Sequence, residues 1–156
     1  MIAPMATGRF KMLTRGCIPF ILVALTGCNG SGRAPAITKP TAAQLAEFTR
    51  NAQIALPASA QPIGWREYRG MDDSLWLQVR MPASDLQGFL NTSPFANATL
   101  ESNSQHIPGN FDKFYTTPPK VYRSGQQEVQ NTRALNILID ESDPKDVIVY
   151  LNWHET

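Results

Sequence analysis

Strict alternation of apolar and polar side chains makes residues 75–81 the clearest β-strand pattern in the chain. Side chains two positions apart share one face of a strand, so the pattern predicts one core face and one wetter face. The core face would carry Leu75, Leu77, Val79 and Met81, and the other face Trp76, Gln78 and Arg80. Residues 65–69 form a second strand pattern, and the Gly-Met-Asp-Asp-Ser sequence of 70–74 between the two predicts a hairpin turn.

A second hairpin is predicted at the end of the chain. Residues 135–139 and 147–153 are rich in apolar side chains, and the intervening 140–146 contains Asp, Ser and Pro, which favour turns. The run from Val147 to Leu151 has few polar interruptions, which predicts a central strand covered on both faces. Residues 120–123 are a further short strand candidate.

Helical spacing of apolar residues occurs in two places. Thr41 and Gln44 fit a capping box and predict a helix over 42–53. A second capping box, Ser84 with Gln87, predicts a short helix that ends before Pro94. The apolar stripe of the first helix is Leu45, Phe48 and Ala52, and that of the second is Leu86, Phe89 and Leu90.

Together these elements predict an α+β fold, namely an antiparallel sheet of about 4–5 strands, formed by two hairpins, with one or two helices packed on one side. Residues 91–119 show no periodicity. A loop of that length is uncommon in a compact domain, so this segment is either functional or contains an element that its pattern does not reveal.

The first 27 residues have the parts of a secretory signal. Arg9, Lys11 and Arg15 precede an apolar run, 17–25, which is much shorter than the roughly 20 residues that span a bilayer. The run ends in Leu25-Thr26-Gly27-Cys28. This sequence resembles the lipobox of bacterial lipoproteins. The resemblance implies cleavage before Cys28, a diacylglyceryl group on its sulfur, and a protein held in the cell envelope by acyl chains such as palmitate.

The same resemblance bears on the choice of membrane. In enterobacterial lipoproteins an Asp after the lipidated cysteine retains the protein at the inner membrane. Asn29 stands at that position here, which implies the outer membrane in a Gram-negative host. Met1, Met5 and Met12 are all possible start residues.

Composition divides the rest of the chain into a tether and one domain. Residues 28–40 are rich in Gly, Ser and Pro and predict a flexible tether, whereas 41–156 has the length of a single-core domain. Three of the 14 basic residues lie in the signal, so 11 remain against 13 acidic residues, a net charge near −2 that disfavours nucleic-acid binding. Cys17 leaves with the signal and Cys28 would be acylated, which leaves no thiol for a disulfide or for thiol chemistry.

Two segments of the domain carry a further resemblance. Leu56-Pro-Ala-Ser-Ala60 and Arg69-Gly-Met-Asp-Asp73, followed by a strand that leads into Pro82, resemble a group of small uncharacterised bacterial lipoproteins. The resemblance spans part of the domain. It agrees with the lipobox and implies no particular activity.

The residues that could support catalysis are few. The chain has no nucleophile elbow, phosphate-binding loop, dinucleotide-binding motif or zinc-peptidase motif, so no enzyme and no cofactor is expected. Its two histidines are His106, in the irregular segment, and His154, near the C-terminus. Two exposed histidines are favoured over a metal site, which would need the histidines to lie beside carboxylates such as Asp112 or Glu155. A Ser–His pair that uses His106 stays open.

The acidic residues are interpreted as turn formers. Asp140, Asp143 and Asp146 lack the Gly and the final Glu of an EF-hand loop, so a turn is favoured over a calcium site. Asp72 and Asp73 follow Gly70 and are likewise favoured as turn residues over paired catalytic carboxylates.

Trp76 is the candidate for binding, together with Gln78 and Arg80 on the same strand face. An aromatic side chain on the polar face of a sheet is typical of a surface that binds a sugar or a protein. The alternative is that the helix bearing Leu86, Phe89 and Leu90 covers this face, in which case Trp76 is a core residue.

The sequence therefore predicts a lipid-anchored envelope protein that contacts the membrane through acylated Cys28 and acts as a non-enzymatic binding module for a protein or saccharide. One alternative is an immunity or inhibitor protein against an envelope-acting toxin or hydrolase, which a neighbouring toxin gene would favour. The other is a small hydrolase, which a pocket that unites His106 with a serine and a carboxylate would favour.

Overall fold

The computed structural model of the chain describes residues 37–107, 109–115, 118–130 and 133–155. The predicted signal peptide, 1–27, and most of the predicted tether, 28–40, lie outside the described residues, and so do Cys28 and Asn29. Pairing begins earlier than the predicted tether boundary. Thr38 and Trp65 exchange two backbone hydrogen bonds of 2.9 and 2.6 Å, so residue 38 already belongs to the folded domain.

Two α-helices, six β-strands and one 3₁₀ turn make up the described part of the chain. In order they are α1 (Ala42–Ala52), β1 (Gln61–Tyr68), β2 (Ser74–Pro82), α2 (Ala83–Asn91), β3 (Glu101–Ser102), η1 (Phe111–Lys113), β4 (Tyr122–Glu128), β5 (Arg133–Asp140) and β6 (Asp146–Glu155).

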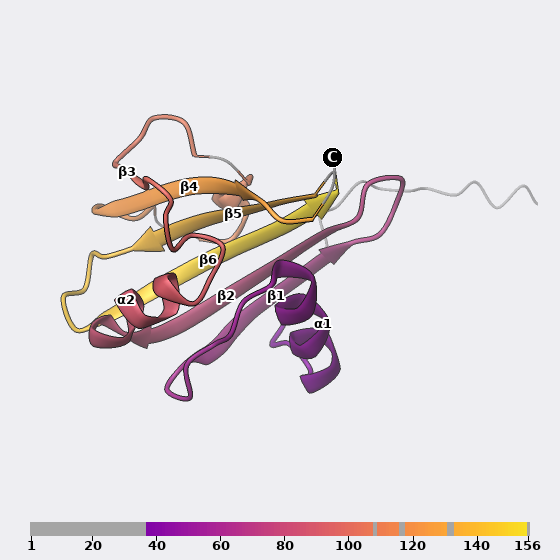
Figure 1. Cartoon of the computed structure of the whole chain (residues 1–156), viewed down its shortest axis with the longest axis horizontal. Helices are drawn as coiled ribbons and strands as arrows, with labels where there is room; N and C mark the ends of the chain where they lie inside the picture. The colour runs from indigo at the N-terminus through magenta and orange to yellow at the C-terminus, as the bar shows by residue number, and fades with distance from the viewer. Residues whose placement is uncertain (1–36, 108, 116–117, 131–132, 156) are drawn as a thin grey trace, which may run out of the picture. The chain divides into compact units, whose positions relative to one another are not determined.

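The strands form one antiparallel sheet in the order β1-β2-β6-β5-β4-β3 (Figure 1). The predicted hairpins are β1–β2 and β5–β6, and the last strand joins them because β6 pairs with β2 as well as with β5. This confirms that 147–151 is a central strand. The α+β class is confirmed too, whereas the sheet has six strands instead of the predicted four or five.

The difference in strand number arises in the second half of the chain. The candidate strand at 120–123 overlaps the start of β4, which begins at Tyr122 and continues to Glu128 through polar residues. Pairing with β5 defines it, because its own sequence has no apolar alternation. The irregular segment 91–119 contains the two-residue β3 and the 3₁₀ turn η1, both too short to leave a periodic signal.

Helix α1 begins at the predicted capping box. The Thr41 hydroxyl oxygen accepts from the Gln44 backbone N–H at 3.2 Å, and the Gln44 side chain accepts from the Thr41 backbone N–H at 2.9 Å. Phe48 and Ala52 are fully buried. The helix ends at Gln53, whose φ of 54° places it in the left-handed conformation that terminates helices.

The capping box predicted for helix α2 is wrong. The helix begins at Ala83, directly after β2, and Pro82 at its N-cap offers no side-chain hydrogen bond. The backbone N–H of Ala83 is instead satisfied by the carbonyl of Lys145 at 2.8 Å, and the Ser84 hydroxyl donates to Asp85. The predicted apolar stripe is confirmed, because Leu86, Phe89 and Leu90 are buried and the helix ends before Pro94.

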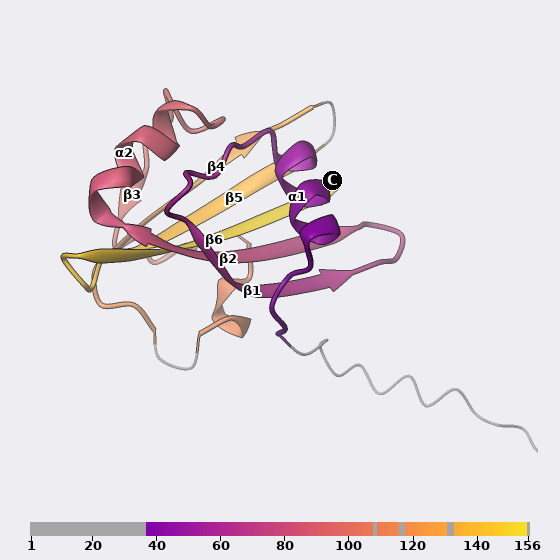
Figure 2. The same cartoon turned by 90° about the horizontal axis from the view of Figure 1, so that it is seen from below.

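Both helices pack on one face of the sheet, and η1 and its flanking loops lie on the other (Figure 2). The helix-side core contains the predicted inward set of β2, Leu75, Leu77, Val79 and Met81, together with Val147, Val149 and Leu151 of β6. A second, smaller cluster on the opposite face contains Phe111, Phe114, Leu138 and Tyr150. We call this opposite face the loop face.

Candidate functional site

The loop face carries all three residues predicted for binding. Strand β2 presents Trp76, Gln78 and Arg80 there, in register with Asn152, Tyr150 and Ile148 of β6. The alternation that predicted a second face is therefore confirmed. The three side chains differ in how far they are open to solvent, because the loop that contains η1 crosses only part of the face.

Trp76 lies under this loop. Its indole Nε1 donates a 3.0 Å hydrogen bond to the carbonyl of Gly109, and its ring centroid lies 6.3 Å from that of Phe114. The Arg66 guanidinium stands over the same ring at 5.5 Å. The indole is half-buried and held on two sides. The sequence suggested α2 as a possible cover for this face, but α2 packs on the opposite face and the η1 loop covers Trp76 instead.

Gln78 and Arg80 lie at the open end of the loop face. Gln78 is half-buried beside Tyr150. Burial raises the pKa of Tyr150 to about 12, the Asp140 carboxylate adds to this effect, and the Gln78 side chain offsets part of it. Arg80 is exposed and borders a shallow cavity of about 280 Å³. The other lining residues of this cavity are Asp140, Ser142, Asp143, Asp146 and Ile148.

Two acidic residues of that cavity, Asp140 and Asp143, act as turn residues. The Asp140 carboxylate accepts from the Ser142 backbone N–H at 2.9 Å, and Asp143 accepts from the Lys145 backbone N–H at 2.8 Å. Such side-chain-to-backbone bonds stabilise tight turns. Among the described residues, no three His, Cys, Asp or Glu side chains are grouped so that they could hold a metal ion.

His106 lines a separate cavity of about 270 Å³ beside β3 and β4. Glu101 and Ser124 border the same cavity, so the structure brings together the residue types of a hydrolytic site. A nucleophile and its base must lie within hydrogen-bond reach of each other. Within the described residues, the only hydrogen bond of His106 is that of its backbone N–H to Ser104, and Ser124 is 2% exposed. His154 lies on another element, β6.

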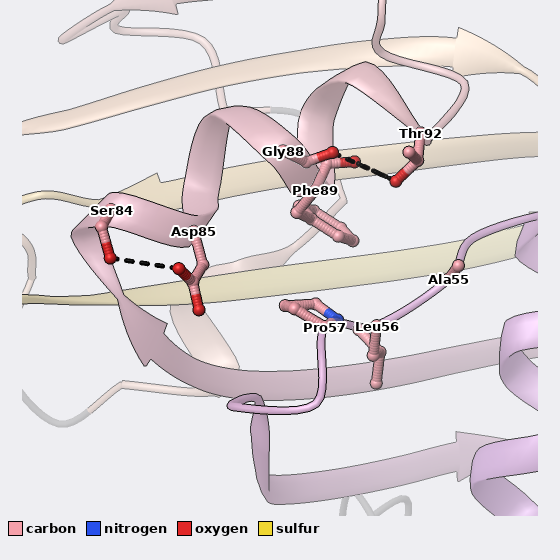
Figure 3. A pocket seen from close by; sticks show the side chains of 8 residues that line it. All are labelled: Ala55, Leu56, Pro57, Ser84, Asp85, Gly88, Phe89 and Thr92. Carbon is pink, nitrogen blue, oxygen red and sulfur yellow. Dashed lines mark hydrogen bonds between the residues drawn. The ribbon is translucent and has the colours of Figure 1, made fainter.

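A third concave surface lies between α2 and the segment that precedes β1, with a volume of about 380 Å³ (Figure 3). Leu56 and Pro57 form one wall, and the helix forms the other. Ser59 donates a hydrogen bond to Asp85, which ties the two walls together. Gly88 lies on the helix wall with open space in front of it. The remaining lining residues are Ala55, Ser84, Asp85, Phe89 and Thr92.

Three residues of the loop face were not singled out from the sequence. Arg66, Asn136 and Asn152 are buried in one row across the sheet with Trp76. The Asn136 amide nitrogen donates to the Asn152 side-chain oxygen at 3.0 Å. Gly109 closes over this row, because a Cβ atom there would lie 2.9 Å from the Asn136 Cβ. The sequence does not reveal this row, because its members come from strands that lie far apart in the chain.

Comparison with known proteins adds no assignment: the chain matches no protein-family model, no curated protein and no solved structure. No helix among the described residues combines the length and the apolar character needed to cross a membrane.

Proposed function

We propose that this chain is a lipid-anchored protein of the bacterial cell envelope whose domain acts as a non-enzymatic binding module. The observation that carries the anchor is the sequence Leu25-Thr26-Gly27-Cys28 after a short apolar run with basic residues on its N-terminal side. Two or more acyl chains on Cys28 hold a protein stably on a bilayer. Because Asn29, and not Asp, follows Cys28, we place the protein at the outer membrane of a Gram-negative host.

Binding is the role that the described surfaces support best. A hydrolase would need His106 within reach of a nucleophile, and the His106 ring makes no hydrogen bond to Ser124 or Glu101, its neighbours in the cavity. The loop face instead offers a mixed polar and apolar surface at its open end, where Gln78, Arg80 and Ile148 lie side by side. Such a surface suits a protein or saccharide partner.

The anchor is tested by comparing the two cysteines of the chain. Cells that express the full chain are fed an alkyne analogue of palmitate, and labelling is read on the purified protein. We expect the wild type to be labelled and to fractionate with membranes. Cys28→Ala should lose the label and accumulate as uncleaved precursor or soluble protein, because it removes the acylated sulfur.

Cys17→Ala is the matched control, since it removes the other thiol from the apolar run without touching the lipobox. It should be labelled like the wild type. An unlabelled wild type, or a Cys28→Ala variant that keeps its label, would contradict the proposed anchor.

A further inference from the structure

The β1–β2 hairpin presents an apolar side chain at its apex. Met71 is 96% exposed, and Tyr68 at the end of β1 is 56% exposed. The hairpin protrudes at the end of the sheet where β6 also ends (Figures 1 and 2). An almost fully exposed methionine together with a second large exposed side chain makes this end of the hairpin a candidate contact surface.

The apex is held in a fixed shape. The Arg69 guanidinium pairs with Asp73 across the loop at 3.0 Å and with Glu47 of α1 at 2.7 Å. The Asp73 carboxylate also accepts from the Gly70 backbone N–H at 3.2 Å. The Asp73 carbonyl accepts from the backbone N–H of Glu155 at 3.1 Å, which joins the loop to β6. A loop ordered in this way loses little conformational entropy when it binds.

Tyr68 extends the apolar surface of the apex. Its ring lies against Gly70, where an added Cβ atom would come within 2.7 Å of the ring, so only glycine lets the ring lie there. Tyrosine has an apolar ring and a polar hydroxyl, and it is enriched at the interface between a bilayer and water. Tyr68 therefore suits a loop that contacts a membrane, and Met71 adds exposed apolar surface beside it.

The length of chain between the proposed anchor and the domain limits how far the hairpin can lie from the bilayer. Thr38 pairs with Trp65, three residues before Tyr68 on the same strand. From Cys28 to Ile37 the chain can span at most about 30 Å when fully extended. An acylated Cys28 would thus keep the apex within reach of the bilayer surface. One methionine binds a membrane weakly in free solution, but a short tether makes the contact intramolecular and raises its effective concentration.

We propose that Tyr68 and Met71 dock the domain onto the bilayer that holds Cys28, so that the hairpin is a second membrane contact beside the acyl chains. This rests on the proposed anchor. A surface of zwitterionic phospholipid fits the charges around the apex, because Arg69 is already paired with carboxylates and the neighbouring Asp72 is exposed. The domain would then have a fixed orientation, with the opposite end of the sheet directed away from the membrane.

The experiment uses the chain from Cys28 onward, which holds every described member of both hydrophobic clusters and a single thiol. Cys28 is coupled to a maleimide-bearing lipid in phosphatidylcholine vesicles, and the soluble reference carries N-ethylmaleimide on the same sulfur. Both are treated with hydrogen peroxide, and methionine sulfoxide is followed by peptide mass spectrometry. From Cys28 onward the chain has two methionines, Met71 at 96% exposure and Met81 at 1%, so Met81 reports whether the domain stays folded.

We expect the oxidation of Met71 to slow by about fivefold or more on vesicles, because oxidation follows exposure to the aqueous oxidant. Val121→Met provides the matched control. Val121 is 50% exposed and lies at the opposite end of the sheet, next to the Tyr122–Asp140 pair, so the methionine introduced there should oxidise at the same rate in both states.

Equal oxidation of Met71 on vesicles and in solution would overturn the docking proposal. Equal protection of Met71 and of the residue introduced by Val121→Met would overturn it as well, since mere crowding by the vesicle would then explain both. Neither result affects the anchor, because coupling to the vesicle is chemical here and acylation of Cys28 is measured separately in cells. Protection of Met71 in native envelopes but not on vesicles would assign the apex to a protein partner and overturn the lipid contact.

Discussion

Arg66 is the residue whose environment is least expected from its chemistry. Its side chain is 7% exposed, and none of the ion pairs among the described residues includes it. Its Nε also has no hydrogen-bond partner there. A buried cation without a counter-charge is costly, and the compensation visible in the structure is the face of the Trp76 ring at 5.5 Å. Trp76 thus stabilises the charge as well as filling space.

Replacing Trp76 with Ala should therefore destabilise the domain by about 2–4 kcal/mol, somewhat below the range for a fully buried tryptophan. The change removes the hydrogen bond to Gly109, the packing against Phe114 and the aromatic face under Arg66. Urea unfolding of the two proteins measures the difference. Tyr68→Ala is the control, because that aromatic side chain is exposed and should change stability little. An unchanged midpoint for Trp76→Ala would mean that the η1 loop does not cover the ring in solution.

The sequence allowed the side-chain direction of Trp76 to be predicted, but not its surroundings. Alternation along β2 is a local property, and it correctly separated Trp76 from Leu75 and Leu77. The contacts of the indole come from Gly109 and Phe114, more than thirty residues further along the chain in a segment without periodicity. No local pattern encodes such a contact, so both an open and a covered Trp76 were compatible with the sequence.

At the scale of elements, the buried faces were predicted correctly from repeating apolar patterns, whereas only one of the two predicted capping boxes, that of α1, is confirmed. The stripe of α2 places its buried face correctly, since burial of three side chains outweighs any end effect. The predicted start of α2 was wrong. The backbone N–H of its first residue donates to the carbonyl of Lys145, in the distant β5–β6 turn, and not to a capping side chain. The β3 and β4 strands have little apolar content, and their existence follows from pairing with neighbours.

Gly88 provides a test of α2 itself. Glycine in a helix interior costs conformational entropy, and a Cβ atom at position 88 would meet nothing within 4 Å. Gly88→Ala should therefore stabilise the domain by about 0.5–1 kcal/mol, seen as a higher urea midpoint.

Gly109→Ala is the matched comparison for this substitution. Gly109 has a φ of +95°, and its added Cβ would lie 2.9 Å from the Asn136 Cβ. This change should destabilise the domain by about 1–3 kcal/mol, because it combines backbone strain with overlap. If Gly88→Ala lowered the midpoint instead, the space in front of α2 would be filled in solution.

At the scale of the whole molecule, β6 connects the two hairpins and both hydrophobic clusters. It pairs with β2 on one side and β5 on the other, while Val149 faces the helix-side core and Tyr150 the loop face. The strand is buried along 149–153. This position follows from the sequence, since an apolar run with few polar residues suits only a strand covered on both faces. The order of the neighbouring strands could not be predicted from the sequence, because either hairpin could have lain at an edge of the sheet.

A charge placed in this strand should therefore unfold the domain as a unit. Val149 is fully buried between β2 and β5, so Val149→Asp would bury a carboxylate with no partner and cost about 4 kcal/mol or more. We expect little soluble protein, and no cooperative transition in what can be purified. Val121→Asp makes the same chemical change at a half-exposed position outside the strands and should leave solubility and midpoint nearly unchanged. A soluble Val149→Asp domain that unfolds cooperatively would show that β6 is not the centre of the sheet, and the arrangement of both faces would then have to be revised.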